Sequence, residues 1–451
     1  MCTGEKLTVN EVIDILNNVV SLIIFLIDEA LKAVNPFNIT QGHLMLDGNE
    51  LKIKDNDKEF KYDLRGKDIR CICIGKGSVP MAKSVDKMFG SRISQGLVIT
   101  KYDHLGDLKL PANWHCIESA HPVPDEMSLY AGDRIWDLLA DCTEQTIVLM
   151  CISGGASALA VAPSAWRNLI ELLDNPPTLI ISQETQQLIR AAISQESIDL
   201  NTINIEENIP LEVIQLIGIA LLGSGLPIDK INAVRSKIDR LKAGGLVDRV
   251  QPGKVIGLIL SDVIGDPIAS IASGLTNHPR ADNFLVGNNQ QACEAIAQAA
   301  NNMGYNAHIV TTKLDGEARI QGADIAREII TQPSKTMLIY GGETTVTLPD
   351  NCHGKGGRNQ ELGLAAAIEL SKHDVPAWII TLATDGTDGP TDAAGVTVNE
   401  TTVQRGLNLG LDAQLALDQH NSYPFFDRLG DLHRIGATGT NVADITIAIM
   451  D

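Results

Sequence analysis

The sequence contains no run of basic residues, and its 36 lysines and arginines are outnumbered by 56 aspartates and glutamates. The formal net charge is therefore -20 at pH 7. Proteins that bind nucleic acid neutralise its phosphates with clustered lysine and arginine, so this composition argues against DNA or RNA as a partner. An anionic substrate would have to be held by a few placed cations or by a metal ion, against an unfavourable overall field.

Paired cysteines and long apolar runs are also missing. None of the eight cysteines forms a CxxC pair, which predicts reduced thiols used as small core residues and a cytoplasmic location. The apolar stretch VVSLIIFLI at 19–27 runs directly into DEALKAV. It is too short to span a bilayer and lacks the features of a signal peptide, so we expect an amphipathic helix stopped by Pro36 and no membrane partner.

The usual nucleotide-binding and hydrolase fingerprints do not occur either. No GxxxxGK[ST] P-loop is present, and GKGSVP at 75–80 has proline where a GxGxxG motif would have its last glycine. SGGASAL at 153–159 does not meet the GxSxG pattern, and no histidine and aspartate are placed to complete a triad. The usual dinucleotide-binding motif is therefore absent, and a serine-hydrolase elbow is matched only loosely.

What the sequence does contain is a repeated pattern of an apolar run, a glycine-rich polar loop and an amphipathic stretch. Continuous apolar runs are typical of strands covered on both faces, and their alternation with helices predicts an α/β fold with largely parallel sheets. The pattern occurs at 69–78, 146–157, 255–266, 336–343 and 378–389, and further strand-like runs lie at 96–101, 284–289 and 307–312.

A length of 451 residues predicts two domains. We expect an N-terminal extension at 1–24, a first domain at 25–280 and a second domain at 281–451, although either terminus could cross back onto the other domain. Residues 164–209 have few glycines and no catalytic-looking pattern. This region is therefore predicted to be helix, linker or a surface insertion.

Glycines and ionisable residues collect at the carboxyl ends of the predicted strands, and open α/β sheets bind ligands at that edge. Five such loops predict an active-site cleft. Arg358 and Asn359 follow two glycines at the start of a predicted helix. The first-turn amides, the helix dipole and a two-pronged guanidinium favour an anion there. The alternative is a surface arginine that pairs with Glu361.

Two more loops have the features of anion sites. Lys76 lies between two glycines at a strand end, where it could meet a phosphate or carboxylate, although solvated Lys-Gly turns are common. SGGASAL supplies backbone amides and two hydroxyls suited to a phosphate nest. His121 in HPVPDEMS is interpreted as part of a rigid turn that starts a helix at Asp125.

The acidic loops SDVIGD at 261–266 and TDGTDG at 384–389 also follow strand-like runs. Asp followed by Gly is ordinary turn chemistry, so either loop alone could be structural. Beside phosphate-binding loops, however, such acids are suited to Mg²⁺, which binds a few carboxylates together with substrate phosphates. The candidate metal ligands are Asp262, Asp266, Asp385 and Asp388, and Asp385 is favoured because it is nearest to a strand end.

These segments, in this order, resemble the glycerate 2-kinase family, the class II glycerate kinases with a C-terminal MOFRL domain. The most specific motifs are GGRNQE at 356–361, TDGTDGPTDAAG at 384–395 and TGTNVAD at 438–444, and the resemblance runs from about residue 34 to 445. It implies phosphorylation of D-glycerate at the 2-hydroxyl with ATP and a divalent cation, usually Mg²⁺. It also implies two α/β domains, a Rossmann-like N-terminal one with a parallel sheet and a C-terminal MOFRL-type one, with the active site in the cleft between them.

The resemblance also assigns roles to residues. Lys76 and Arg358 correspond to the family's catalytic lysine and arginine. A homodimer is left open. The predicted substrate- and phosphate-binding residues are Gly75, Gly77, Ser153, Gly154, Gly155, Ser157, Arg235, Lys242, Gly357, Asn359 and Glu343.

Departures from the family pattern leave two other functions open. Leu275 and Ala437 stand where proline is usual, Asp239 where serine is usual, and Ala243 where glycine is usual. The last two lie near the expected substrate site, so substrate choice is less secure than the fold. The alternatives are an NAD(P)H-dependent hydroxypyruvate reductase, which the missing GxGxxG disfavours, and a non-catalytic small-molecule-binding relative.

Overall fold

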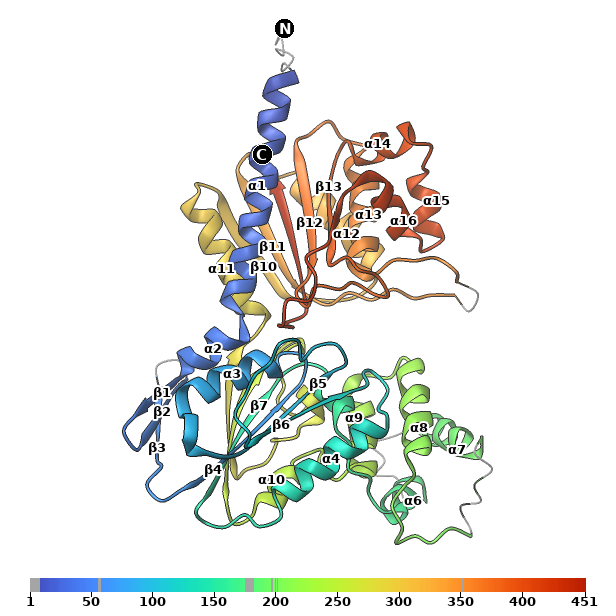
Figure 1. The fold of residues 1–451 in the computed structure, drawn as a ribbon. Helices are drawn as coiled ribbons and strands as arrows, with labels where there is room; N and C mark the ends of the chain where they lie inside the picture. The colour runs from blue at the N-terminus through green and yellow to red at the C-terminus, as the bar shows by residue number, and fades with distance from the viewer. Residues whose placement is uncertain are drawn as a thin grey trace. The chain divides into compact units, whose positions relative to one another are not determined.

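The computed structural model describes residues 9–55, 58–174, 182–195, 198, 200, 202–349 and 352–451. The chain divides into two compact units, which Figure 1 shows as ribbons. One unit comprises Pro36–Gly287, and we call it the N-terminal unit. The other, the C-terminal unit, comprises Asn288–Asp451 together with the chain before Pro36.

The N-terminal unit is built on a sheet of six parallel strands in the order β6-β5-β4-β7-β8-β9. Every residue of β7 is buried, as expected for a strand covered on both faces. The strands are β4 (Asp68–Ile74), β5 (Ile93–Lys101), β6 (Trp114–Ser119), β7 (Thr146–Ile152), β8 (Lys254–Leu260) and β9 (Ala281–Gly287).

Helices cover both faces of this sheet. The helix α3 (Ser78–Phe89) packs on β4, β5 and β7. A second set, α4 (Glu126–Leu138) and α10 (Gly245–Val250), contributes to a core that contains Ile72 and Ile74 of β4. The helix α4 begins where the sequence predicts, because Asp125 and Ser128 form a capping box at its first turn.

Two smaller parts complete the N-terminal unit. One contains α2 (Pro36–His43) and an antiparallel sheet of β1 (Leu44–Asp47), β2 (Glu50–Asp55) and β3 (Lys58–Asp63). The other is a helical cluster with its own apolar core, made by α6 (Trp166–Asp174), α7 (Gln183–Ser194), α8 (Leu211–Gly223) and α9 (Ile228–Ile238). The described part of 164–209 therefore contains helices that pack with α8 and α9, while 175–181, 196–197, 199 and 201 lie outside the described residues.

The C-terminal unit has a mixed sheet of six strands in the order β10-β11-β15-β12-β13-β14. Only β10 and β11 pair in parallel; the other neighbours are antiparallel. The expectation of largely parallel sheets is therefore wrong for this unit, because the last strand of the chain inserts between β11 and β12. The strands are β10 (Asn306–Leu314), β11 (Thr336–Gly342), β12 (Ala377–Ala383), β13 (Gly395–Asn399), β14 (Leu432–His433) and β15 (Asp444–Met450).

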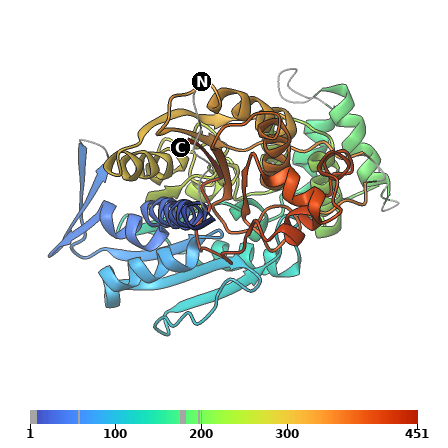
Figure 2. The same cartoon turned by 90° about the horizontal axis from the view of Figure 1, so that it is seen from above.

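The helices of the C-terminal unit lie in two groups (Figure 1). On one side, α11 (Asn289–Asn302) packs on β10 and β11, and α1 (Val9–Ala33) packs along α11; Figure 2 views α1 nearly end-on. The other group consists of α12 (Ala318–Ile329), α13 (Arg358–Leu370), α14 (Thr402–Asn408), α15 (Ala413–Asp418) and α16 (Ser422–Leu429).

Two expected boundaries differ from this arrangement. The boundary between 280 and 281 falls at the start of β9, the edge strand of the N-terminal sheet, and the compact units divide after Gly287 instead. The expected extension at 1–24 overlaps α1, which belongs to the C-terminal unit; residues 1–8 lie outside the described residues. No helix in the described part of the chain is long and apolar enough to cross a membrane.

Candidate functional site

The loop that carries Lys76 follows β4 and is hydrogen-bonded to the loop that follows β7. These strands are neighbours, and the chain proceeds from them in opposite directions across the sheet, which is where open α/β sheets bind ligands. The Lys76 amide donates to the carbonyl oxygen of Gly154 at 2.9 Å, and the Gly77 amide donates to Ser153 Oγ at 2.8 Å. The two predicted phosphate-binding loops therefore form one connected structure.

Glycine is required in this structure because the loops approach closely. Gly75 has φ +121°, and a Cβ there would lie 2.3 Å from Ser153 Oγ. Gly155 has φ +88°, and a Cβ at that position would lie 3.2 Å from the ring of His121 and 3.6 Å from Cγ of Lys76. Thus Lys76 and His121 both lie over Gly155. His121 was interpreted only as part of a turn, and its place beside Lys76 follows from the loop after β6.

Lys242 is buried and paired with Asp239. Its ammonium donates to the Asp239 carboxylate, which also accepts from the amides of Ala162 at 3.2 Å and Leu241 at 3.0 Å. Burial lowers the pKa of Lys242, and the charge of Asp239 opposes that shift. The residue at which the sequence departs from the family pattern therefore neutralises one of the predicted substrate-binding cations.

Arg235 is the other predicted cation of this region. It lines a pocket together with Pro122, Ser157, Leu221 and Lys242. No hydrogen bond or ion pair joins its guanidinium to any residue that the structure describes. Burial lowers the pKa of Arg235, while the nearby charge of Asp239 raises it. A half-buried guanidinium without a partner among those residues is a group suited to bind a carboxylate or phosphate.

Three further predicted residues lie near the same edge of the N-terminal sheet. Ser157 Oγ is 2.6 Å from Ser273 Oγ, so its hydroxyl is part of a local hydrogen-bond network. Asp262 and Asp266 follow β8, the neighbour of β7, and their loop is therefore on the edge that carries Lys76. Asp266 has φ +57°, a conformation that non-glycine residues seldom adopt.

Arg358, the first residue of α13, is held by two acids in the C-terminal unit. Its Nε donates to Asp444 Oδ2 at 2.5 Å and its Nη2 donates to Asp444 Oδ1 at 3.1 Å. Its Nη1 lies 2.7 Å from Glu343 Oε1. Burial opposes the charge of Arg358, but Asp444 and Glu343 outweigh it and raise its pKa above the ordinary value. The alternative pairing with Glu361 is wrong, because Glu361 binds Arg319 and His420.

Asp444 is a functional candidate that the sequence prediction missed. It is the first residue of β15, which runs antiparallel to β11 and β12. The start of β15 therefore lies at the same edge as the ends of those two strands, and Asp444 is the register partner of Gly342 and Ala383. Burial raises the pKa of Asp444, while Arg358 lowers it. To predict this position of Asp444 from the sequence, one would have to know that β15 runs antiparallel to its neighbours.

The two predicted metal ligands of TDGTDG have different surroundings. Asp388 is 1 % exposed, and its oxygens accept from the amides of Asn359 at 3.1 Å and Gln360 at 2.9 Å, at the start of α13. Burial and the charge of Asp444 raise the pKa of Asp388 to about 6. Asp385 is half-buried and accepts from the Thr387 amide at 3.0 Å. Asp388 therefore caps a helix, while Asp385 has an oxygen nearer to solvent.

The four predicted carboxylates are divided between the units, with Asp262 and Asp266 in the N-terminal unit and Asp385 and Asp388 in the C-terminal unit. Within the described ranges, the one group of three or more metal-binding side chains whose ligand atoms all lie within 4.8 Å of one another is Cys71, Cys73 and Cys151. The assignments of these four residues stay predictions.

Comparison with known proteins identifies the family. Residues 336–444 match the MOFRL family, and residues 23–205 and 177–303 match a domain of unknown function, DUF4147. The glycerate 2-kinase of Pyrococcus horikoshii is 32% identical over an alignment that covers 94% of this chain and 96% of that protein. This chain belongs to the MOFRL-type glycerate kinase family. The family indicated by the sequence motifs is thereby confirmed.

A solved structure and a second relative add to this comparison. A crystal structure of glycerate kinase from Thermotoga maritima is 29% identical, covers 96% of this chain and is itself covered fully, with a TM-score of 0.73. The predicted α/β fold is thus confirmed. A protein of Agrobacterium vitis that carries the provisional name hydroxypyruvate reductase is 30% identical over 83% of this chain and 98% of its own.

Proposed function

We propose that the protein phosphorylates D-glycerate to 2-phosphoglycerate, with ATP as the phosphoryl donor and Mg²⁺ as the accompanying cation. The observation that carries this proposal is the similarity to a curated glycerate 2-kinase along nearly the whole chain. Independent support comes from the chemistry of the loops, because each unit has a cation that directly follows a glycine next to a helix start: Lys76 before α3 and Arg358 in α13.

Lys76 and Arg358 are proposed to neutralise the charge of the transferring phosphoryl group and to hold it in line with the acceptor oxygen. Phosphoryl transfer depends on such positioning and on stabilisation of charge on the phosphate oxygens. A guanidinium has five N–H donors, and the two acids use three of those of Arg358, so two remain for a substrate. Asp444 and Glu343 are positioning residues in this proposal, because they fix the plane of the guanidinium.

Arg235 is proposed to bind the carboxylate of glycerate. Its half-buried guanidinium has no partner among the described residues, and it lines a pocket with Ser157 and Lys242. Since Asp239 already neutralises Lys242, Arg235 supplies the uncompensated positive charge of this pocket. A small hydroxy acid bound there would pair its carboxylate with the guanidinium through two parallel N–H donors.

The phosphates of ATP are proposed to bind the amides of the Gly75–Gly77 and Ser153–Gly155 loops, as in other backbone nests. Mg²⁺ binds one or two carboxylates together with phosphate oxygens, so it needs no larger protein cluster. Asp388 already accepts from two backbone amides, so binding an ion would disturb the start of α13, and Asp385, Asp262 and Asp266 are the other proposed ligands. When bound, the ion would add positive charge at the phosphate oxygens. The free thiols of the described cysteines support a reducing, cytoplasmic location.

The decisive experiment incubates the protein with MgATP and D-glycerate and separates the 2- and 3-phosphates of the product. We expect ADP and 2-phosphoglycerate in equal amounts. Arg358→Ala should lose turnover and keep its far-ultraviolet circular dichroism, whereas Arg327→Ala, which removes an exposed arginine of α12, should keep both. Near-normal turnover in Arg358→Ala would contradict the catalytic role of Arg358. If the wild type forms no ADP, the kinase proposal is overturned.

A parallel arm of the experiment tests the reductase name carried by the Agrobacterium vitis relative. It supplies hydroxypyruvate with NADH or NADPH and follows nucleotide oxidation, for which we expect no signal. A third arm titrates Mg²⁺ against activity in Asp385→Asn. We expect a higher Mg²⁺ concentration at half-maximal rate than in the wild type, and an unchanged titration would leave Asp385 with its turn role alone. Ligand-induced stabilisation by ATP and glycerate without turnover would instead indicate a non-catalytic relative.

A further inference from the structure

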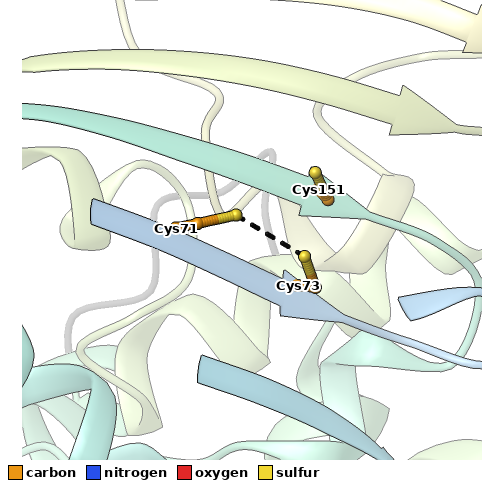
Figure 3. Close-up of side chains that lie close together, drawn as sticks. All are labelled: Cys71, Cys73 and Cys151. Carbon is orange, nitrogen blue, oxygen red and sulfur yellow. Dashed lines mark hydrogen bonds between the residues drawn. The ribbon is translucent and has the colours of Figure 1, made fainter. Parts of the chain in front are cut away.

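Three cysteine thiols meet in the core of the N-terminal unit, as Figure 3 shows. Cys71 and Cys73 are alternate residues of β4 and therefore point to the same face of the sheet. Cys151 of β7 is the register partner of Cys73 and points to that face as well. The sulfurs of Cys71 and Cys73 lie 3.6 Å apart, and all three sulfurs lie within 4.8 Å of one another. Each of the three side chains is 0 % exposed.

We propose that Cys71, Cys73 and Cys151 form a binding site for one thiophilic divalent cation, of the class to which Zn²⁺ and Cd²⁺ belong. A zinc–sulfur bond is about 2.3 Å long, so three sulfurs around one ion lie about 4 Å apart in a plane. The sulfurs of Cys71 and Cys73 are 3.6 Å apart and no pair is separated by more than 4.8 Å, which is compatible with that value. Small side-chain adjustments would therefore complete a three-sulfur site.

The ligands decide which kind of ion the site would bind. Thiolates are soft ligands that favour zinc-like and copper-like ions over Mg²⁺ or Ca²⁺. Among the described histidines, cysteines and acids, no fourth side chain joins the group. Three thiolates with a divalent cation leave a net charge of -1, whereas a monovalent cation would leave -2. Since burial makes every uncompensated charge costly, the divalent ion is favoured.

Thiols bind a metal as thiolates, so binding of the cation releases their protons. The affinity of the site should therefore rise with pH.

The position of the group in the sheet gives the ion a structural consequence. Cys73 comes two residues before Gly75, and Cys151 comes two residues before Ser153. An ion bound to both would join β4 to β7 directly behind the loops that carry Lys76 and Ser153. We therefore expect binding to raise the melting temperature of the protein, because an ion that binds only the folded state stabilises it by mass action.

Cd²⁺ is the probe that tests this site most directly. The full-length protein is produced in medium supplemented with Cd²⁺, so that the ion is present while the core forms, and is purified without oxygen and washed with chelator. We expect one Cd²⁺ per chain, a cadmium–thiolate absorption band in the ultraviolet and a melting temperature above that of protein made without Cd²⁺. All three signals should disappear in the Cys71→Ala/Cys73→Ala/Cys151→Ala variant.

The matched control is Cys293→Ala, which removes a buried cysteine outside the group and should retain the bound Cd²⁺. If the triple variant does not fold, Cys151→Ala alone serves, because it leaves two sulfurs and should lose the ion. The proposal is overturned if the wild type contains no stoichiometric Cd²⁺, or if the triple variant retains it. It is also overturned if the unfolded, metal-free wild type shows two thiols fewer than its eight cysteines, since that result indicates a disulfide.

Discussion

Gly357→Ala tests the connection between TDGTDG and the helix that carries Arg358. Gly357 is the N-cap of α13 and has φ -146°, so its backbone conformation is open to any residue. Its constraint is a close approach, because a Cβ there would lie 2.2 Å from Cγ of Asp388 and 2.4 Å from both carboxylate oxygens. Ordinary carbon contacts are about 3.5–4.0 Å, so Asp388 would have to move by more than about 1 Å.

That movement would remove Asp388 from the start of α13. Its oxygens accept from the amides of Asn359 and Gln360, and both of those residues are at most 2 % exposed. Water therefore cannot replace the lost acceptor easily. A hydrogen bond to a charged group contributes about 1.5–3 kcal/mol, so losing two predicts a destabilisation of about 3–6 kcal/mol. Such a value would be exceptional for a glycine-to-alanine change with no conflict in φ.

Urea unfolding and hydrogen exchange together measure this effect. We expect a lower urea midpoint for the C-terminal unit and faster exchange in peptides that cover α13. Gly42→Ala is the matched control, because Gly42 is exposed in α2 and a Cβ there meets nothing within 4 Å. The control should be neutral or slightly stabilised. A Gly357→Ala protein within about 1 kcal/mol of wild type would refute the reasoning, since Asp388 would then be able to move without loss.

Three other predictions address the same loops. Gly75→Ala should abolish kinase activity at nearly unchanged secondary structure, because a Cβ would lie 2.3 Å from Ser153 Oγ at φ +121°; activity within twofold of wild type would contradict this. Because the pKa of Asp388 is raised from 3.8 to about 6, the folded state binds a proton in that window that the unfolded chain lacks. The free energy of unfolding should therefore fall as the pH rises from 4 to 6, and Asp388 contributes up to about 3 kcal/mol to that fall. Asp388→Asn should show a smaller fall than the wild type, and an equal fall would contradict the raised pKa of Asp388. Asp444→Asn should lower kcat about ten- to a hundredfold with a smaller change in KM, since Arg358 loses its charged acceptor; steady-state kinetics decides, and an unchanged kcat would contradict the positioning role.

The sequence predicts most of the strands because their apolar runs are continuous. The runs at 69–78, 146–157 and 255–266 correspond to β4, β7 and β8, each of which is almost entirely buried. Parallel neighbours place their carboxyl ends at one edge, so the link between the Lys76 and Ser153 loops follows from the same pattern. Continuous apolar runs are sufficient to locate these strands, because helices cover both faces of the sheet and nearly every position of these strands is buried.

Long-range strand order is what the sequence does not reveal. The run that forms β15 is as apolar as the others. Its residues do not indicate that it lies between β11 and β12 and runs antiparallel to both. Asp444 was missed for that reason, since an acid before a strand belongs to the ligand-binding edge only if the strand is antiparallel. Likewise, the packing of α1 on α11 depends on contacts between segments more than 250 residues apart, which local patterns do not encode.

The two Asp-Gly pairs of TDGTDG show how one local pattern can serve two purposes. Both have the composition of a turn, and both follow the same buried strand. Asp388 differs from Asp385 only in its partners, which are amides nearly thirty residues upstream in α13. Asp388 is thereby a buried helix cap whose pKa is raised by burial and by the charge of Asp444, against the lowering effect of the amides, while Asp385 is half-buried. If a metal ligand must exchange its protein hydrogen bonds for the ion, Asp388 would release the start of the helix that carries Arg358. The structure thus gives a physical reason for disfavouring Asp388 as a metal ligand, which proximity to the strand end alone does not supply.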